Sequence, residues 1–349
     1  MKKTTNILIL FLVLSFVLAG CSNNSQPANE SNSTEQQNHK SEGMDDDYVV
    51  KLSYSGSLCQ APAQLAYELG YFKEEGINIE FVKSEQAASD LMVSGQLDVY
   101  QEMIPKIIQQ VDNGLDIKVA SGVHTGCLKV LTLADNNEIN SIKDLKGKKI
   151  GVPGVASSQA IIVQRTLMEY GIGATPENME VEFITFNASD LQMALENGSV
   201  DAISLGDPSA SQIAESGVGK LIFNQATDPL YENEYCCAFV FSPEFAEEHA
   251  DLAAKTLKAL QKACMYVDQH PEEAAQIQVD KAYVAGDPKL NAKLLESYNY
   301  RPSIEGGKEA LKENILDLQK LGMISNDLEA DAVVDKIYIE FEDVDEVSN

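Results

Sequence analysis

Two adjacent serines at the start of a predicted helix form the clearest chemical site in the sequence. Ser157 and Ser158 follow a short apolar run, Lys149–Val152, and a Pro153–Gly154 break, and a helical pattern then continues to Gly171. Serine is a preferred residue at the N-cap. The N-terminus of a helix also presents unpaired N–H groups and a partial positive charge. Hydroxyls and N–H groups in this arrangement predict an oxyanion site, and a simple strand–turn–helix unit with a serine cap is the alternative.

Two acidic residues lie near the predicted ends of strands. Glu102 comes after the predicted strand Leu97–Tyr100, and Asp207 comes after the predicted strand Val200–Leu205. A carboxylate beside a bare anion is unfavourable unless another charge compensates it. The acids and the serines together therefore predict a ligand that carries an amine as well as an acidic group. Glu102 could instead be solvated, and Asp207 could instead cap a helix that has Pro208 at its first position.

The cysteines and one histidine raise the question of a metal site. His124, Cys127, Cys236 and Cys237 fall on neighbouring predicted segments. Adjacent residues of a strand point to opposite faces, so only one of Cys236 and Cys237 is expected to join a cluster. No closed four-ligand spacing is present either. The sequence thus predicts neither a metal nor a cofactor, and it leaves open a disulfide from Cys127 to either member of the pair.

The first 20 residues have the pattern of an export signal. Lys2 and Lys3 precede an apolar stretch at 7–18, which is too short to span a bilayer. The tetrad LAGC at 18–21 looks like a bacterial lipobox, which implies that Cys21 carries the lipid. Residues 21–47 are rich in Ser, Asn, Gln and Glu and predict a disordered tether. We therefore expect a chain held by its lipid on the extracytoplasmic face of the membrane.

Composition limits the function of the globular part. The chain has 349 residues, with 54 acidic against 26 basic side chains and a net charge of −28. Such an excess of negative charge argues against binding nucleic acid through its phosphates. Hydrophobic residues make up 44% of the chain, which is enough for a packed core in two lobes. No Ser-His-Asp order or other catalytic set stands out, so we expect a protein that is not an enzyme.

Strands and helices alternate from Tyr48 onward, which predicts an α/β fold with a largely parallel sheet. Predicted helices follow the last strong strand, Tyr235–Phe241, to the end of the chain. They cover about 244–269, 272–283, 288–298, 305–321 and 327–338.

Four segments carry a resemblance to a known family. They are AP-x-x-LAYELGYFKEEGI at 61–77, SIKDLKGKKIGVPGVASSQ at 141–159, VDAISLGDPSA at 200–210 and CCAFVFSPEFAEEHADLAAKTLKAL at 236–260. Together they resemble the extracytoplasmic solute-binding proteins of ABC importers for nitrate, sulfonates and taurine. The superfamily also contains thiamine-pyrimidine and riboflavin binders and pyrimidine synthases. The resemblance implies a periplasmic-binding-protein-like fold, type II, in which two lobes are joined by two crossing segments near 124–130 and 234–240.

The resemblance also implies a ligand site between the lobes. Lobe one would comprise 48–125 and 237–349, and lobe two 126–236. The family's serine or threonine position falls on Ser157 and Ser158, and its first-lobe loop falls on 56–60. The candidate ligand residues are Gly56, Ser57, Cys59, Gln60, Glu102, His124, Ser157, Ser158, Asp207 and Tyr235.

Three functions remain open at this stage. The first is a lipoprotein that binds a sulfonate, nitrate or taurine-type solute and delivers it to an ABC permease with its ATPase. The second is a binder of a thiamine-precursor pyrimidine, stacked on Tyr54, Tyr100 and Tyr235, or a related pyrimidine-synthase-like enzyme. The export signal argues against the enzyme. The third is a sensory protein that binds its ligand in the same way.

Overall fold

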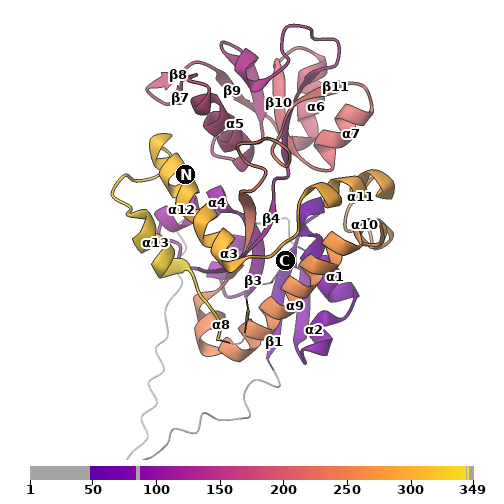
Figure 1. Ribbon diagram of the computed structural model, residues 1–349, viewed down its shortest axis with the longest axis vertical. Helices are drawn as coiled ribbons and strands as arrows, with labels where there is room; N and C mark the ends of the chain where they lie inside the picture. The colour runs from indigo at the N-terminus through magenta and orange to yellow at the C-terminus, as the bar shows by residue number, and fades with distance from the viewer. Residues whose placement is uncertain (1–47, 84–86, 343, 346–349) are drawn as a thin grey trace, which may run out of the picture. The chain divides into compact units, whose positions relative to one another are not determined.

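The computed structural model describes residues 48–83, 87–342 and 344–345. The predicted signal segment, Cys21 and the predicted tether lie outside these residues. The described part contains two five-stranded sheets, with strand orders β2-β1-β3-β12-β4 and β11-β5-β10-β6-β9 (Figure 1). Among the described helices, none combines the length and the apolar character that crossing a bilayer requires.

The first sheet mixes parallel and antiparallel strands. It consists of β1 (Val49–Tyr54), β2 (Asn78–Lys83), β3 (Val99–Met103), β4 (Lys118–Thr125) and β12 (Tyr235–Phe241). Strand β1 pairs in parallel with β2 and β3, whereas β12 runs antiparallel to both β3 and β4. The sequence predicts the strand Tyr235–Phe241 and a parallel-rich sheet, but not the antiparallel insertion of β12 between β3 and β4, because β12 comes from a distant part of the chain.

Helices from both ends of the described chain cover the first sheet, and together they form the first lobe (Figure 1). The early helices are α1 (Ala61–Glu68), α2 (Tyr71–Glu74), α3 (Ala88–Val93) and α4 (Ile104–Asp112). The late ones are α8 (Pro243–Glu248), α9 (Ala250–Gln269), α10 (Pro271–Asp280), α11 (Pro288–Ser297), α12 (Ile304–Lys320) and α13 (Ala330–Ile337). The predicted helix at 244–269 is in fact two helices that meet at His249.

The second sheet and its helices form the second lobe. Its strands are β5 (Leu128–Leu133), β6 (Lys149–Val152), β9 (Glu182–Thr185), β10 (Ala202–Gly206) and β11 (Gly219–Asn224), with a hairpin of β7 (Ala174–Thr175) and β8 (Asn178–Met179) at its side. Its helices are α5 (Ser158–Glu169), α6 (Leu191–Glu196) and α7 (Ser209–Glu215). Gly151 lies where α6 packs on β6, since a Cβ there would come within 2.8 Å of the Leu191 side chain.

Two short segments join the lobes, and they contact each other. The first runs from the end of β4 at Thr125 to the start of β5 at Leu128, and the second runs from β11 to β12. A Cβ at Gly126 would lie 2.5 Å from the backbone nitrogen of Ala226, so only glycine fits at this contact. The second crossing precedes Tyr235 rather than lying within 234–240, because β12 is already part of the first sheet.

Candidate functional site

A hollow of about 490 Å³ is lined by residues of both lobes. The first lobe contributes Glu102, Met103 and Lys106, and the second contributes the β6–α5 loop with the first turn of α5. The second-lobe lining consists of Pro153, Gly154, Ala156, Ser157, Ser158 and Gln159. Three of the candidate residues, Glu102, Ser157 and Ser158, are therefore brought together here, and we call this hollow the interlobe pocket.

The second-lobe wall of the interlobe pocket is the N-terminus of α5. Ser157 is its N-cap and accepts a hydrogen bond from the backbone nitrogen of Ala160 at 3.3 Å. The Ser157 hydroxyl also donates to the carbonyl oxygen of Gly154 at 2.6 Å. The first turn of this 12-residue helix contains no acidic residue. The positive end of its dipole therefore faces the pocket without a local carboxylate to neutralise it.

The first-lobe wall contains one partly ionised acid. Glu102 lies inside β3, which extends to Met103, rather than after the strand as predicted. Its Oε1 atom accepts a hydrogen bond from the backbone nitrogen of Met103 at 2.9 Å. Burial raises the pKa of Glu102 to about 7, while that hydrogen bond and the charge of Lys106 act in the opposite direction. Near neutral pH this carboxyl group can therefore gain or lose a proton when a ligand arrives.

Lys106 adds a positive charge that the sequence analysis misses. It lies in the first turn of α4, four positions beyond Glu102, and it lines the interlobe pocket. The signal in the sequence is the spacing: Lys106 is a basic residue four positions after Glu102, at the start of the helix that follows the strand. The pocket thus holds a carboxyl group, an ammonium group and a helix N-terminus.

Asp207 is already paired with groups of the chain itself. Its carboxylate forms a buried salt bridge with Lys129, and both side chains are at most 2% exposed. It also accepts hydrogen bonds from the hydroxyls of Ser211 at 2.7 Å and Tyr298 at 2.8 Å. Instead of receiving an amine from a ligand, Asp207 receives the amine of Lys129. The antiparallel register of β5 and β10 places Lys129 opposite Leu205, two positions before Asp207. The sequence does not reveal this register, so it does not predict the pairing.

The remaining loop and aromatic candidates do not line the interlobe pocket. Gly56 is exposed, and the side-chain oxygen of Gln60 accepts a hydrogen bond from the backbone of Ser55. The Ser57 hydroxyl lies 3.1 Å from the Cys59 sulfur. Tyr235 donates to the carbonyl of Arg301 and lies beside Gly306, where a Cβ would meet its ring. These contacts give Tyr235, Gln60 and Ser57 local structural roles.

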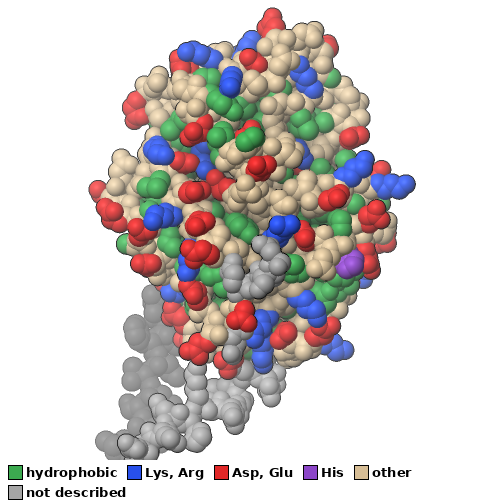
Figure 2. Space-filling view, in the orientation of Figure 1, with side chains coloured by type: hydrophobic (Ala, Val, Ile, Leu, Met, Phe, Trp, Pro, Cys, Tyr) green, Lys and Arg blue, Asp and Glu red, His purple; other side chains and the backbone are tan. Residues whose placement is uncertain are grey.

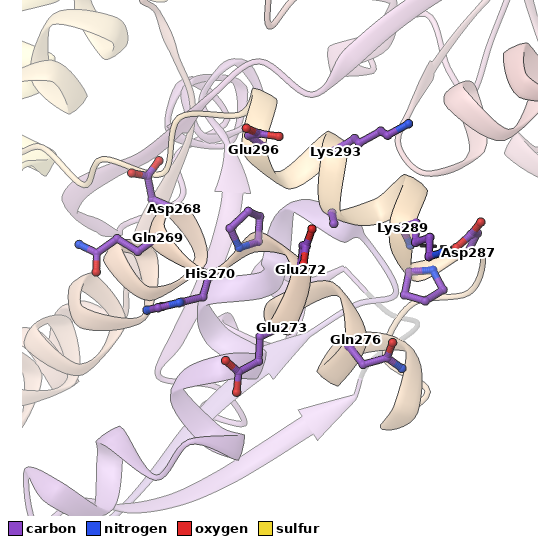
Figure 3. Close-up of a pocket in the computed structure, with 13 residues that line it drawn as sticks. Asp268, Gln269, His270, Glu272, Glu273, Gln276, Asp287, Lys289, Lys293 and Glu296 are labelled. Atoms are coloured by element: carbon purple, nitrogen blue, oxygen red, sulfur yellow. Dashed lines mark hydrogen bonds between the residues drawn. The ribbon is translucent and has the colours of Figure 1, made fainter.

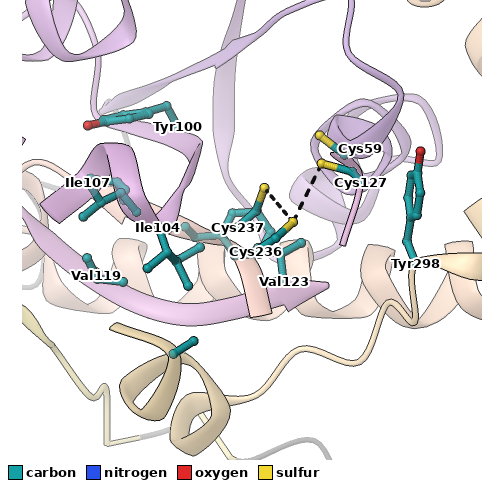
Figure 4. Close-up of a cluster of buried hydrophobic side chains, with 14 of the residues drawn as sticks. Cys59, Tyr100, Ile104, Ile107, Val119, Val123, Cys127, Cys236, Cys237 and Tyr298 are labelled. Carbon is teal, nitrogen blue, oxygen red and sulfur yellow. Dashed lines mark hydrogen bonds between the residues drawn. The ribbon is translucent and has the colours of Figure 1, made fainter. Parts of the chain in front are cut away.

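Cys59 and His124, by contrast, lie in a buried cluster with three further cysteines. The sulfur atoms of Cys127 and Cys236 are 3.8 Å apart, and those of Cys236 and Cys237 are 3.5 Å apart (Figure 4). The imidazole of His124 is 3.5 Å from the Cys236 sulfur through Nδ1. We call these five residues the thiol cluster. All of its cysteines are free thiols, with no disulfide from Cys127 to either neighbour.

Both members of the Cys236–Cys237 pair reach the thiol cluster, which corrects the expectation that only one could. The pairing of β12 with β4 shifts register between Tyr235 and Cys237 and again between Cys237 and Ala238. Such an irregularity breaks the strict alternation of side chains between the two faces of a sheet. Burial alone would raise the pKa of the Cys236 thiol, but its hydrogen bonds with Cys127 and Cys237 hold that pKa below the ordinary value of a thiol.

Arg165 connects the two lobes. Its guanidinium group binds both carboxylate oxygens of Glu234, at 2.7 and 2.8 Å, and contacts Asp317 of α12 at 2.9 Å. Asn314 of α12 accepts a further hydrogen bond at 3.1 Å. A bidentate arginine–carboxylate pair is among the stronger polar contacts in proteins. This network holds α5 of the second lobe against α12 of the first.

A larger hollow lies elsewhere in the first lobe. It has a volume of about 1050 Å³ between the end of α9, α10 and α11 (Figure 3). Its lining includes Asp268, Glu272, Glu273, Asp287 and Glu296. Acidic side chains are also scattered over the face shown in Figure 2, as the net charge of −28 implies. This hollow takes its acids from one lobe only, so we assign the candidate site to the interlobe pocket.

Comparison with known proteins gives one matching family and several relatives. The family model described as NMT1/THI5 like matches residues 60–274. A Bacillus subtilis (strain 168) protein named for binding aliphatic sulfonates is 26% identical over 281 residues, which cover 78% of this chain and 77% of that protein. A 4-amino-5-hydroxymethyl-2-methylpyrimidine phosphate synthase of Aspergillus parasiticus is 26% identical over 249 residues, which cover 68% of this chain and 70% of that enzyme.

The fold is also that of a solved structure. The alkanesulfonate-binding protein SsuA of Xanthomonas axonopodis pv. citri, bound to MOPS, aligns with a TM-score of 0.68 at 15% identity. The alignment covers 84% of this chain and 98% of SsuA. At this level of identity the comparison establishes the shared two-lobed fold.

Proposed function

This chain belongs to the NMT1/THI5-like family, and from that premise we propose that it is an extracytoplasmic solute-binding protein. In this proposal it captures a small sulfonate that also carries an amine, in the interlobe pocket, and delivers it to an ABC permease with its ATPase. It is a binding protein and not an enzyme.

The observation that carries the proposal is the composition of the interlobe pocket. One wall is the N-terminus of α5 with Ser157 and Ser158, which suits the sulfonate oxygens. The other wall holds Glu102, whose carboxylate form suits an ammonium group, and Lys106, which offsets its charge. Opposite walls of one pocket thus match opposite ends of a zwitterion.

Two of the relatives support a sulfonate over the other ligand classes. The Bacillus subtilis protein is named for aliphatic sulfonates, and SsuA holds MOPS, which combines a sulfonate with an amine. Nitrate would use only the anion-binding wall of the interlobe pocket.

The pyrimidine alternative has less support in the structure. The Aspergillus parasiticus relative is a pyrimidine phosphate synthase. Of the tyrosines suggested as stacking faces, Tyr54 stacks on Phe81, and the buried Tyr100 bonds to Gln110. Neither they nor Tyr235 line the interlobe pocket.

The proposal includes the way in which the protein is held at the membrane. Acylation of Cys21 and a tether at 21–47 would place the two lobes at the extracytoplasmic surface, beside a permease. With the second boundary moved to the start of β12, lobe one would comprise 48–125 and 235–349, and lobe two 126–234. Closure of these lobes over the solute would present a single surface to the permease.

A melting experiment tests the ligand class. The intact chain is heated with taurine, an amine-free alkanesulfonate, nitrate or an aminopyrimidine. A ligand at 100 times its Kd stabilises the fold by about 2.7 kcal/mol, so a cognate solute gives a clear shift of the melting temperature. We expect taurine to give the largest shift and Glu102→Gln to lose most of it.

Two results would contradict the proposal. Equal stabilisation by the amine-free sulfonate would show that Glu102 does not contact the ligand. A shift with the aminopyrimidine alone would show that the α5 N-terminus does not bind an oxyanion.

A further inference from the structure

We propose that the thiol cluster is a metal site, in which Cys127, Cys236, Cys237 and His124 hold one tetrahedral d¹⁰ cation, Zn²⁺ or Cu⁺. The site is separate from the proposed solute pocket, and its existence does not depend on the identity of the solute.

Two sulfur–sulfur separations in the thiol cluster are close to those of a tetrahedral thiolate site. With zinc–sulfur bonds of about 2.3 Å, two sulfurs of a tetrahedron lie about 3.8 Å apart, and a sulfur and a nitrogen about 3.5 Å apart. The observed separations are 3.8 Å for Cys127–Cys236 and 3.5 Å for Cys236–Cys237. Two overlapping groups of three ligands, Cys59–Cys127–Cys237 and His124–Cys236–Cys237, each have all ligand atoms within 4.8 Å.

The tautomer of His124 places its lone pair on Nε2. Its Nδ1 atom lies 2.6 Å from the carbonyl oxygen of Thr125, and because a carbonyl only accepts, Nδ1 must carry the hydrogen. The lone pair is then on Nε2, which accepts the amide N–H of Gln101 at 3.4 Å and lies 4.0 Å from the Cys236 sulfur, so a bound metal would take the place of the Gln101 donor. Metal-binding histidines commonly donate their other N–H to a backbone carbonyl, and His124 has such a carbonyl in Thr125.

Charge favours His124 over Cys59 as the fourth ligand. Three thiolates and a neutral imidazole leave a zinc site with one negative charge, whereas four thiolates leave two. The thiol cluster is almost wholly buried, so each additional net charge there is costly. Cys59 then lies beside the metal ligands as a thiol, close to Cys127 and Cys237.

The surroundings of the cluster are more polar than those of a cysteine used only for packing. Gln101 is 7% exposed, and its Nε2 atom lies 3.4 Å from Nε2 of His124. Within the described chain, the Oε1 atom of Gln101 has no hydrogen-bond partner, although buried amides are normally satisfied. Cys264 shows the other case, because it is buried in α9 apart from both ligand groups.

A small crevice lies between the interlobe pocket and the thiol cluster. This crevice of about 10 Å³ shares Met103 and Ser158 with the interlobe pocket and is lined by Cys236. Cys127 lies in the first crossing segment, and Cys236 and Cys237 follow the second. A bound ion would therefore tie the two crossing segments together.

The test loads the intact, reduced chain with one metal at a time. After dialysis with Zn²⁺, Cu⁺ or the spectroscopic probe Co²⁺, we expect one ion per chain by native mass spectrometry. We also expect thiolate-to-cobalt charge-transfer absorption. X-ray absorption on the zinc form should show three sulfurs at about 2.3 Å and one nitrogen at about 2.0 Å. Of the Zn²⁺ and Cu⁺ arms, the one in which all four ligands coordinate the ion, three sulfurs and one nitrogen, identifies the cation that fits the site.

Matched cysteine variants separate the site from general effects. Cys237→Ser should weaken metal binding at least about 100-fold, and Cys264→Ser, at a buried cysteine outside the cluster, should leave it unchanged. His124→Ala should also lose the metal. If Cys237→Ser does not fold, the wild-type chain can be alkylated with and without Zn²⁺. Bound Zn²⁺ should slow the alkylation of Cys127, Cys236 and Cys237 and leave that of Cys264 unchanged.

Three results would overturn the proposal. The first is cobalt bound without thiolate absorption, and the second is full metal affinity in His124→Ala. The third is a disulfide from Cys127 to Cys236 or Cys237 in the chain as isolated.

Discussion

Replacing Asp207 by asparagine should destabilise the fold strongly, because it leaves a buried ammonium group without its partner. The side chains of Lys129 and Asp207 are 2% and 0% exposed. After the change, Lys129 keeps only the hydroxyl of Ser211, at 3.0 Å. Breaking a buried ion pair on one side costs about 3–5 kcal/mol. At about 2–4 °C per kcal/mol for a large domain, the melting temperature should fall by roughly 6–20 °C.

The double variant Lys129→Met with Asp207→Asn is the matched control. Removing both charges takes away the isolated cation, and replacing a buried pair by neutral groups is often close to neutral in stability. We therefore expect the double variant to recover most of the lost free energy of unfolding. Urea denaturation of the wild type, the two single variants and the double variant gives this coupling directly.

The same variants distinguish a structural from a ligand-binding role for Asp207. If Asp207 received the amine of a solute, Asp207→Asn would lower solute affinity while leaving the free energy of unfolding almost unchanged. Two results together would refute the buried-pair argument. Asp207→Asn would lower the free energy of unfolding by less than about 1 kcal/mol, and Lys129→Met would cost as much in the Asp207→Asn background as in the wild type.

Four other predictions concern Glu102, Arg165 and Cys21. Binding of an ammonium-bearing sulfonate should tighten roughly tenfold from pH 6 to pH 8, since a carboxyl with a pKa of about 7 ionises from about 9% to about 91% over that range. Calorimetry should show this dependence disappear in Glu102→Gln. Without ligand, the raised pKa of Glu102 stabilises the folded state, fully below pH 4.5, and this contribution is lost as the pH rises through 7. The free energy of unfolding should therefore fall over this pH range in the wild type but not in Glu102→Gln. Arg165→Met removes the contacts between α5 and α12, so small-angle scattering of the ligand-free chain should give a larger radius of gyration, and an unchanged value would show that the network does not hold the lobes together. Cys21→Ala should release the protein or leave an uncleaved precursor, and normal membrane retention of that variant would rule out the lipid anchor.

Local sequence signals predicted most of the elements correctly. The Pro153–Gly154 break and the serine pair gave the position of α5 and its N-cap, because capping depends on residues within one turn. Hydrophobic periodicity located the late helices, except for the interruption at His249. The four motif segments identified the family, which the match over 60–274 confirms, and with it the two-lobed fold.

Contacts between distant segments decided the candidate site. The sequence brought Ser157, Ser158 and Glu102 into consideration, but only the approach of α4 to the β6–α5 loop puts them in one pocket with Lys106. Likewise, the sequence gives no sign that Asp207 is paired with Lys129, because these residues are 78 positions apart and meet through the antiparallel pairing of β5 and β10.

By itself the sequence determined the signal-like N-terminus, the order of the elements, the family and the helix start that could bind an oxyanion. All of these depend on neighbours along the chain. Tertiary structure decided which polar groups are free and which are already paired, and it assembled the thiol cluster. Strict alternation along a strand predicts that Cys236 and Cys237 point apart, but the register shift of β12 against β4 turns both sulfurs to the same place. Register is set by packing against other strands, so a single strand's own residues do not reveal it.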